Sequence, residues 1–169
     1  MKIERASLGV ALGVALGAVL VLAGTSVANA ATVRVTGTSF ETSPGTCGEP
    51  TLTGMVLRIQ CDEKKETWSG DISGTGTFDE AISLNLVTGE IRVNGTEIIT
   101  DACVDGRCGT LESTWHGSGR LDLQTGAVIL IQGEQRITGG TGSLDGAKGS
   151  LKLSLIGDGP ATYDGIVVL

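Results

Sequence analysis

The chain is short of aromatic residues, histidine and proline, and each shortage narrows what the protein can be. Aromatic residues make up 3% of the sequence, which has one histidine and three prolines in 169 residues. Small aliphatic side chains and bent backbone must therefore fill most of any interior. No long segment after residue 31 has the helical periodicity of about 3.6 residues, which disfavours a helical bundle. No linker-like tract interrupts residues 31–169, so we expect them to form a single domain.

The first 30 residues have the organisation of a secretory signal peptide. Lys2 and Arg5 precede an uncharged apolar run from Leu8 to Ala23, and the Ala28–Ala30 segment supplies a small-x-small cleavage site. The run is short for a membrane span, which needs about 20 residues. We therefore expect a chain that is cleaved after Ala30 and secreted, either out of the cell or into the periplasm.

Positive charge is also scarce. Acidic residues outnumber basic ones 19 to 12, which gives a net charge of −7. This balance disfavours a nucleic-acid backbone or an anionic membrane as the partner, and it fits a soluble secreted protein. We also find no motif that would hold a cofactor.

Four cysteines in a secreted chain predict two disulfides. Cys103 and Cys108 bracket an Asp-Gly turn signal, so we pair them across a hairpin. Cys47 then pairs with Cys61 across the first connection. Cys-x-x-Cys units are absent, which disfavours zinc, and we expect no metal site.

Short alternating segments, separated by glycine, asparagine and aspartate, predict an all-β protein. Many strands of similar length with short turns are typical of an antiparallel barrel or a sandwich, and barrel closure removes exposed edges. The expected strands are Thr32–Phe40, Leu52–Cys61, Thr67–Phe78, Glu80–Val87, Glu90–Asp101, Gly109–Leu123, Ala127–Ile137, Gly149–Ile156 and Ala161–Val168.

The Cys103–Cys108 pair also predicts which side chains around it share a face. Direct pairing outward from this disulfide places Ile98 opposite Ser113. If Gly95 introduces no bulge, the apolar members of the core face are Ile98, Leu111 and Trp115. The wet face then contains Glu97, Glu112, Thr114 and His116.

The Ile137–Leu151 segment is rich in glycine, and we interpret it as a structural turn system between two strands. A phosphate-binding loop would require a following helix and a GK[ST] ending. Here an alternating strand pattern follows, and Lys148 precedes the last glycine rather than following it. The turn glycines are Gly139, Gly140, Gly142, Gly146 and Gly149.

The same segment resembles the allene oxide cyclase and dirigent-like β-barrels, and still more the uncharacterised bacterial secreted proteins that share that barrel. GGTGSLDGAKGSLKLSL, residues 139–155, matches the family's GG[ST]G, two residues and a glycine-containing turn into a strand. Leu144 stands where the family usually has an aromatic. The resemblance implies an antiparallel barrel of roughly eight strands. The family's cyclase confines a reactive fatty-acid intermediate, but none of its catalytic residues aligns here, so we assign none.

Two groups of polar residues could carry chemistry. His116 is the only histidine, but no G-x-S-x-G elbow accompanies it, so we expect a surface histidine rather than a hydrolase triad. Asp62, Glu63 and Glu66 surround two lysines. We interpret that cluster as a solvated loop, with a calcium or substrate site as the alternative.

Trp68 and Trp115 are the only tryptophans, and they are the candidate ligand-binding residues. They would either plug one end of a barrel or form a stacking wall for a flat apolar or sugar ligand. We favour a secreted barrel that binds a small, largely apolar ligand. The alternatives are a cyclase- or isomerase-like enzyme acting on a lipid-derived intermediate, and an extracellular structural or interaction protein. A dry apolar cavity would favour carriage, a lining with glutamate or tyrosine would favour an enzyme, and a filled interior would favour interaction.

Overall fold

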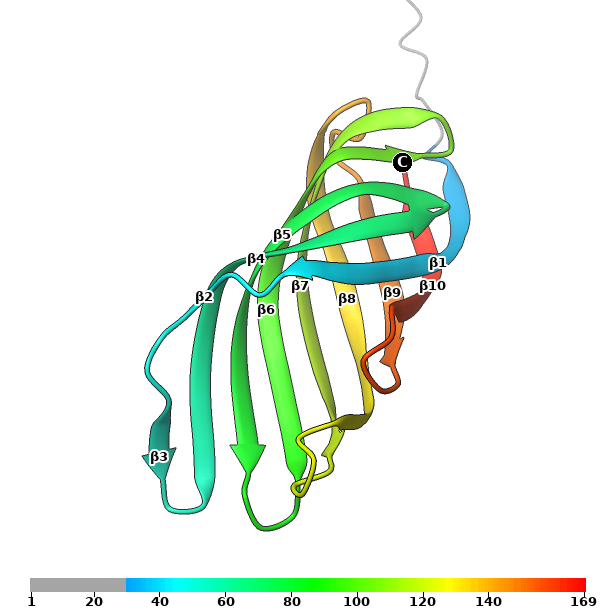
Figure 1. Cartoon of the computed structure of the whole chain (residues 1–169). Helices are drawn as coiled ribbons and strands as arrows, with labels where there is room; N and C mark the ends of the chain where they lie inside the picture. Colours follow the sequence, from blue (N-terminus) through cyan, green and yellow to red (C-terminus); the bar gives the residue numbers. More distant parts are fainter. Residues whose placement is uncertain (1–29) are drawn as a thin grey trace, which may run out of the picture.

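The computed structural model describes residues 30–169, which form one antiparallel sheet without a helix (Figure 1). The predicted signal peptide lies outside the described residues except for Ala30. Among residues 30–169 there is no helix long and apolar enough to cross a membrane. The strands are β1 (Thr32–Ser43), β2 (Thr46–Cys47), β3 (Thr51–Thr53), β4 (Val56–Gly70), β5 (Ile72–Asn85), β6 (Glu90–Val104), β7 (Arg107–Leu121), β8 (Val128–Gly142), β9 (Lys148–Leu155) and β10 (Ala161–Val168).

The eight longer strands close into a ring. Their order is β1-β10-β9-β8-β7-β6-β5-β4, and β1 pairs again with β4 from Gly37↔Gly70 to Ser43↔Lys65. The short strands β2 and β3 pair only with β4. Because the ring pairs both edges of the sheet, it confirms the predicted all-β antiparallel barrel of eight strands.

The ring is closed over only part of its height. The pairing of β1 with β10 ends at Ser39↔Ala161, and that of β8 with β9 ends at Ile131↔Leu155. Beyond these points β4–β8 continue as a curved open sheet (Figure 1). The registers place an apolar set on the inner face of this extension: Leu57, Ile59, Ile82, Leu84, Ile91, Val93 and Ile131.

A cluster of buried, mostly aliphatic side chains fills the closed end of the ring. The turn between β8 and β9 contributes Leu144 and Ala147, which are 1% and 0% exposed. The predicted turn system is smaller than expected, because Gly139, Gly140 and Gly142 lie within β8 and Gly149 lies within β9. The remaining core members are Val35, Trp68, Ile72, Ile99, Ala102, Val104, Leu111, Ile137, Leu151, Tyr163 and Val167.

A β-bulge interrupts β4 at the place where a loop was predicted. The pairing with β5 shifts between Cys61 and Lys64, so that Asp62 and Glu63 together oppose Asp79. Glu63 has a φ of 56°, and its backbone N–H donates to the Asp79 carboxylate at 3.0 Å. The predicted solvated loop is therefore wrong: the charged cluster lies inside a continuous strand. The bulge makes Cys61 and Lys64 both face inward.

The chain instead turns at Gly70 and Asp71, inside the predicted Thr67–Phe78 strand. The Tyr163 hydroxyl accepts a hydrogen bond from the Ile72 backbone N–H at 2.8 Å. A tertiary contact from β10 thus holds this turn, and local sequence does not reveal it.

A second bulge, in β6, changes the predicted faces. The pairing with β7 shifts between Ile99 and Ala102, and Asp101 there has a φ of 50°. As a result Ile98 is 50% exposed and Glu97 only 4% exposed, so the predicted sides of both are wrong. On β7 the predicted sides are correct, with Leu111, Ser113 and Trp115 inward and Glu112, Thr114 and His116 outward.

Both expected cysteine pairs are joined. Cys47 bonds to Cys61 between β2 and β4, and Cys103 bonds to Cys108 across the β6–β7 hairpin. Two disulfides in one small domain indicate folding in an oxidising compartment.

Removing the hairpin disulfide should loosen its tip and leave the ring folded. The double substitution Cys103→Ser, Cys108→Ser opens a short loop, so the loop-entropy estimate gives a loss of about 2 kcal/mol. Cys47→Ser with Cys61→Ser opens a longer loop, and the matching estimate is about 3 kcal/mol. Urea unfolding followed by far-ultraviolet circular dichroism measures both. Loss of all β signal in the Cys103/Cys108 variant would contradict this expectation.

Candidate functional site

A pocket of about 130 Å³ lies inside the ring, next to the hydrophobic core. Each of the eight ring strands contributes at least one lining residue. On each strand the lining residues continue the inward-facing row of the core, as Glu97 follows Ile99 and Gln135 follows Ile137. The pocket is therefore the layer of the interior that aliphatic side chains do not fill.

Aromatic side chains form a large part of the lining. Trp68, Phe78 and Trp115 are three of the five aromatic residues of the whole chain, and all three line this pocket. The Phe78 and Trp115 rings meet edge to face with centroids 6.0 Å apart. Trp68 packs against Tyr163 of the core with centroids 5.0 Å apart. The two tryptophans that the sequence singled out are thus brought together at one site.

Glu97 is the most deeply buried acid of the lining. Trp68 Nε1 donates to its Oε1 at 2.8 Å, and Gln135 Nε2 donates to its Oε2 at 2.6 Å. Gln135 also donates to Ser113 Oγ at 2.7 Å, which fixes the amide in place. Both carboxyl oxygens therefore have partners, as a buried polar group requires.

Glu66 lies beside Glu97, because Glu97 Oε1 and Glu66 Cγ both lie directly over the backbone of Gly76. Burial, followed by the neighbouring Glu66, raises the pKa of Glu97 well above its ordinary value. Burial also raises the pKa of Glu66, against the lowering effect of hydrogen bonds from Glu97, Ser39 and Trp68. Two adjacent buried carboxyl groups repel each other when both are ionised, so we infer that the pair shares one proton and carries one negative charge.

Gly76 of β5 makes room for this carboxyl pair. A Cβ atom at Gly76 would collide with Glu97 Oε1 and lie 2.9 Å from Glu66 Cγ. The missing side chain lets the two acids lie directly over the strand backbone.

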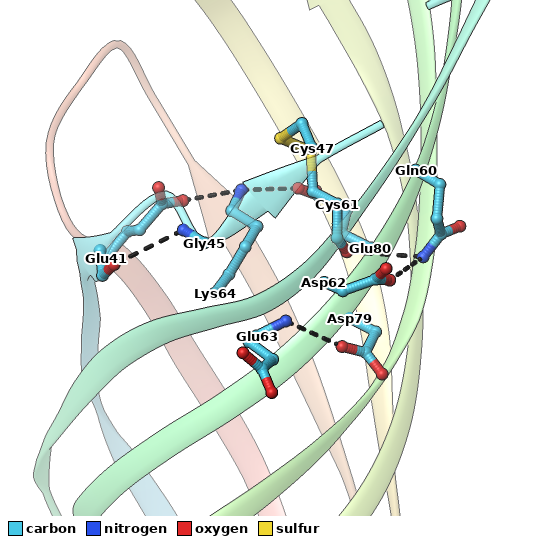
Figure 2. The surroundings of a disulfide bond; sticks show 11 residues. Glu41, Gly45, Cys47, Gln60, Cys61, Asp62, Glu63, Lys64, Asp79 and Glu80 are labelled. Atoms are coloured by element: carbon cyan, nitrogen blue, oxygen red, sulfur yellow. Dashed lines mark hydrogen bonds and ion pairs between the residues drawn. A yellow bond between two sulfur atoms is a disulfide. The ribbon is translucent and has the colours of Figure 1, made fainter. Parts of the chain in front are cut away.

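Lys64 precedes Glu66 by two residues in the same inward-facing row of β4. Its Nζ lies 2.7 Å from a Glu80 carboxylate oxygen and 2.9 Å from one of Glu41 (Figure 2). Burial lowers the pKa of Lys64, but the hydrogen bonds to Glu80 and Glu41 outweigh it and raise that pKa above its ordinary value. One ammonium thus faces two carboxylates, and the Glu66–Glu97 pair adds a further negative charge. The lining carries a net negative charge.

Glu66 belongs to the charged cluster for which the sequence left a substrate site as the alternative, whereas Glu97 was missed for a reason that the sequence contains. Counting back from the disulfide puts Ile98 on the inner face, whereas Ile91, Val93 and Ile99 alternate in the phase that includes Glu97. These two patterns place opposite faces of the same strand inside. Such a disagreement within one strand indicates a bulge between the two parts.

The other predicted site residues lie elsewhere. The turn glycines belong to the closed end of the ring, and His116 is exposed on the outer face. Within residues 30–169, no three histidine, cysteine, aspartate or glutamate side chains are arranged to hold a metal ion.

Comparisons with known proteins identify the fold alone. No family model matches the chain, and no curated protein matches it. One similar solved structure is a protein of unknown function from the DUF3224 family of Shewanella oneidensis MR-1, with a TM-score of 0.63 and 18% sequence identity. The similarity covers 81% of this chain and 96% of that chain. Chemistry must therefore be argued from the pocket itself.

The buried acids should make stability depend on pH. Because the pKa of Glu97 is raised in the folded state, its stabilising contribution is complete below the ordinary glutamate value and is lost as pH rises through the folded value. The unfolding free energy should therefore fall from about pH 4.5 towards neutral, by about 1.4 kcal/mol for each unit of pKa elevation.

Urea titrations at several pH values, read by tryptophan fluorescence, measure this slope. Glu97→Gln should flatten the slope, since a glutamine side chain does not titrate. Glu112→Gln, on the exposed face of β7, is the matched control and should leave the slope unchanged. A Glu97→Gln variant with the wild-type slope would show that the pair does not titrate in this range.

Proposed function

We propose that this protein is a secreted binding protein that holds a small ligand in the ring pocket. The observation that carries this proposal is the convergence of Trp68, Phe78 and Trp115 with hydrogen-bonding acids around one opening. Aromatic residues make up only 3% of the chain. If they served only to pack the core, three of them would not be expected around the part of the interior that remains open. Apolar walls with a few converging polar groups are typical of small-molecule sites.

The size of the pocket limits what it can enclose. A cavity of roughly 150 Å³ is enough to bind benzene, and this pocket measures about 130 Å³. It would therefore enclose one ring or a group of similar bulk. The apolar inner face of the β4–β8 extension continues from the pocket and could receive a further apolar part of the ligand.

Secretion is supported by two independent features. The amino-terminal 30 residues have the pattern of a signal peptide, and the two disulfides require an oxidising compartment.

An acid–base enzyme is the second candidate, and the Glu66–Glu97 pair favours it. Two carboxyl groups that share a proton provide one donor and one acceptor, as proton-transfer catalysis requires. The resemblance to allene oxide cyclases also suggests an enzyme, but one that acts by confining a reactive intermediate rather than by acid–base chemistry. Binding without chemical change to the ligand would separate the first proposal from this one.

Benzyl alcohol is a suitable neutral probe, because both tryptophans line the pocket and their fluorescence reports on it directly. We expect saturable quenching with a Kd near 1 mM, or about 4 kcal/mol. Ala161→Phe should abolish binding by filling the pocket from β10. Thr162→Phe places the same ring on the exposed face of that strand and should bind normally. Binding that survives Ala161→Phe, or no quenching of the wild type by benzyl alcohol and benzylamine, would overturn the proposal.

A further inference from the structure

We propose that the ligand of this pocket is a small organic monocation whose ammonium group pairs with Glu66 and Glu97 while its apolar body packs against Trp68, Trp115 and Phe78. This inference rests on the proposed function and names the chemical class of the ligand. It excludes fatty acids and other anions as the preferred ligands.

Charge is the first reason. The acids facing the carboxyl pair are Glu41 from β1 and Glu80 from β5, and both are already bound to Lys64. From β6, β7 and β8 the pair meets Ser113 and Gln135, which are neutral, and the lining residues of β9 and β10 are Leu153 and Ala161. No cationic residue among the lining is thus left to balance the charge of Glu66 and Glu97. An uncompensated charge in a poorly hydrated interior is unfavourable, and a cationic ligand would supply the missing partner.

The aromatic lining is the second reason. Faces of tryptophan and phenylalanine attract cations within about 6 Å of the ring centroid. Lys64 Nζ already lies 5.2 Å from the centroid of the Phe78 ring, so this pocket holds a cation over an aromatic ring in the absence of any ligand. A ligand ammonium over the face of one of the tryptophan rings would gain the same attraction.

Hydrogen bonding is the third reason. Glu97 already accepts from Trp68 and Gln135, whereas Glu66 is the more exposed member of the pair and lines the opening. Carboxylates only accept hydrogen bonds, and an ammonium group only donates them. A ligand carboxylate would place acceptor against acceptor at the same point.

Binding should release a proton. A cation next to the pair favours the form in which both carboxyl groups are ionised. The shared proton then leaves for solvent, and affinity for the cation should rise with pH until the pair is fully ionised. A neutral ligand of the same shape should show neither effect.

Benzylamine and benzyl alcohol test this, because they differ only in an ammonium against a hydroxyl group. Isothermal titration at neutral pH should show benzylamine binding at least ten-fold more tightly, and repeating it in two buffers of different ionisation enthalpy should show net proton release. Glu66→Gln should still bind benzylamine through the carboxyl group of Glu97. The double variant Glu66→Gln, Glu97→Gln should lose the ten-fold preference for the amine, and Glu112→Gln should behave as the wild type.

The outcomes separate the two proposals. If neither compound binds the wild type, the proposed function fails and this inference fails with it. If the alcohol binds as tightly as the amine, the pocket is a binding site but its ligand is not a cation. A double variant that keeps a ten-fold preference for the amine would also overturn the inference. If the double variant does not fold, proton release by the wild type on binding benzylamine tests the inference instead. Release supports a cationic ligand, and no release contradicts it.

Discussion

Two β-bulges decide which side chains face the interior, and the site depends on them. Each inserts one residue and reverses the alternation on one side of it. The bulge after Cys61 turns Lys64, Glu66 and Trp68 inward, and the bulge before Ala102 does the same for Glu97. Without them a ring with the same strand order would bury Ile98 and expose these acids. The pocket chemistry is a consequence of register.

Burying Glu97 is unfavourable unless its environment compensates, and the structure provides two compensations. Trp68 and Gln135 donate hydrogen bonds to its two oxygens. Gly76 provides the space. The pair nevertheless retains a negative charge without an ammonium partner of its own. A stable core would be simpler with leucine at these positions, and the proposed ligand would account for the acids that stand there instead.

The closed end of the ring is filled by side chains, whereas the interior is accessible at the open end. At the closed end, aliphatic residues and the β8–β9 turn supply a continuous core. Towards the other end β1, β9 and β10 stop while β4–β8 continue, so the interior becomes reachable. The fold is similar to that of a protein from the DUF3224 family. This similarity does not indicate a function, because one fold can support many functions and the residues that line the pocket determine which one.

Local sequence was sufficient for the all-β class, the cysteine pairs and the faces of β7, and it singled out Trp68 and Trp115, which both line the pocket. These follow from alternation, turn residues and rarity, which are readable within one segment. It was not sufficient for the boundary between β4 and β5, or for the inward direction of Glu97, Glu66 and Lys64. Tyr163 holds the turn at Gly70–Asp71 from a distant strand, and pairing with neighbouring strands places the bulges. Alternation shows only that successive side chains point to opposite faces of a strand. The pairing with neighbouring strands decides which face is inside, because one inserted residue moves every following side chain to the other face.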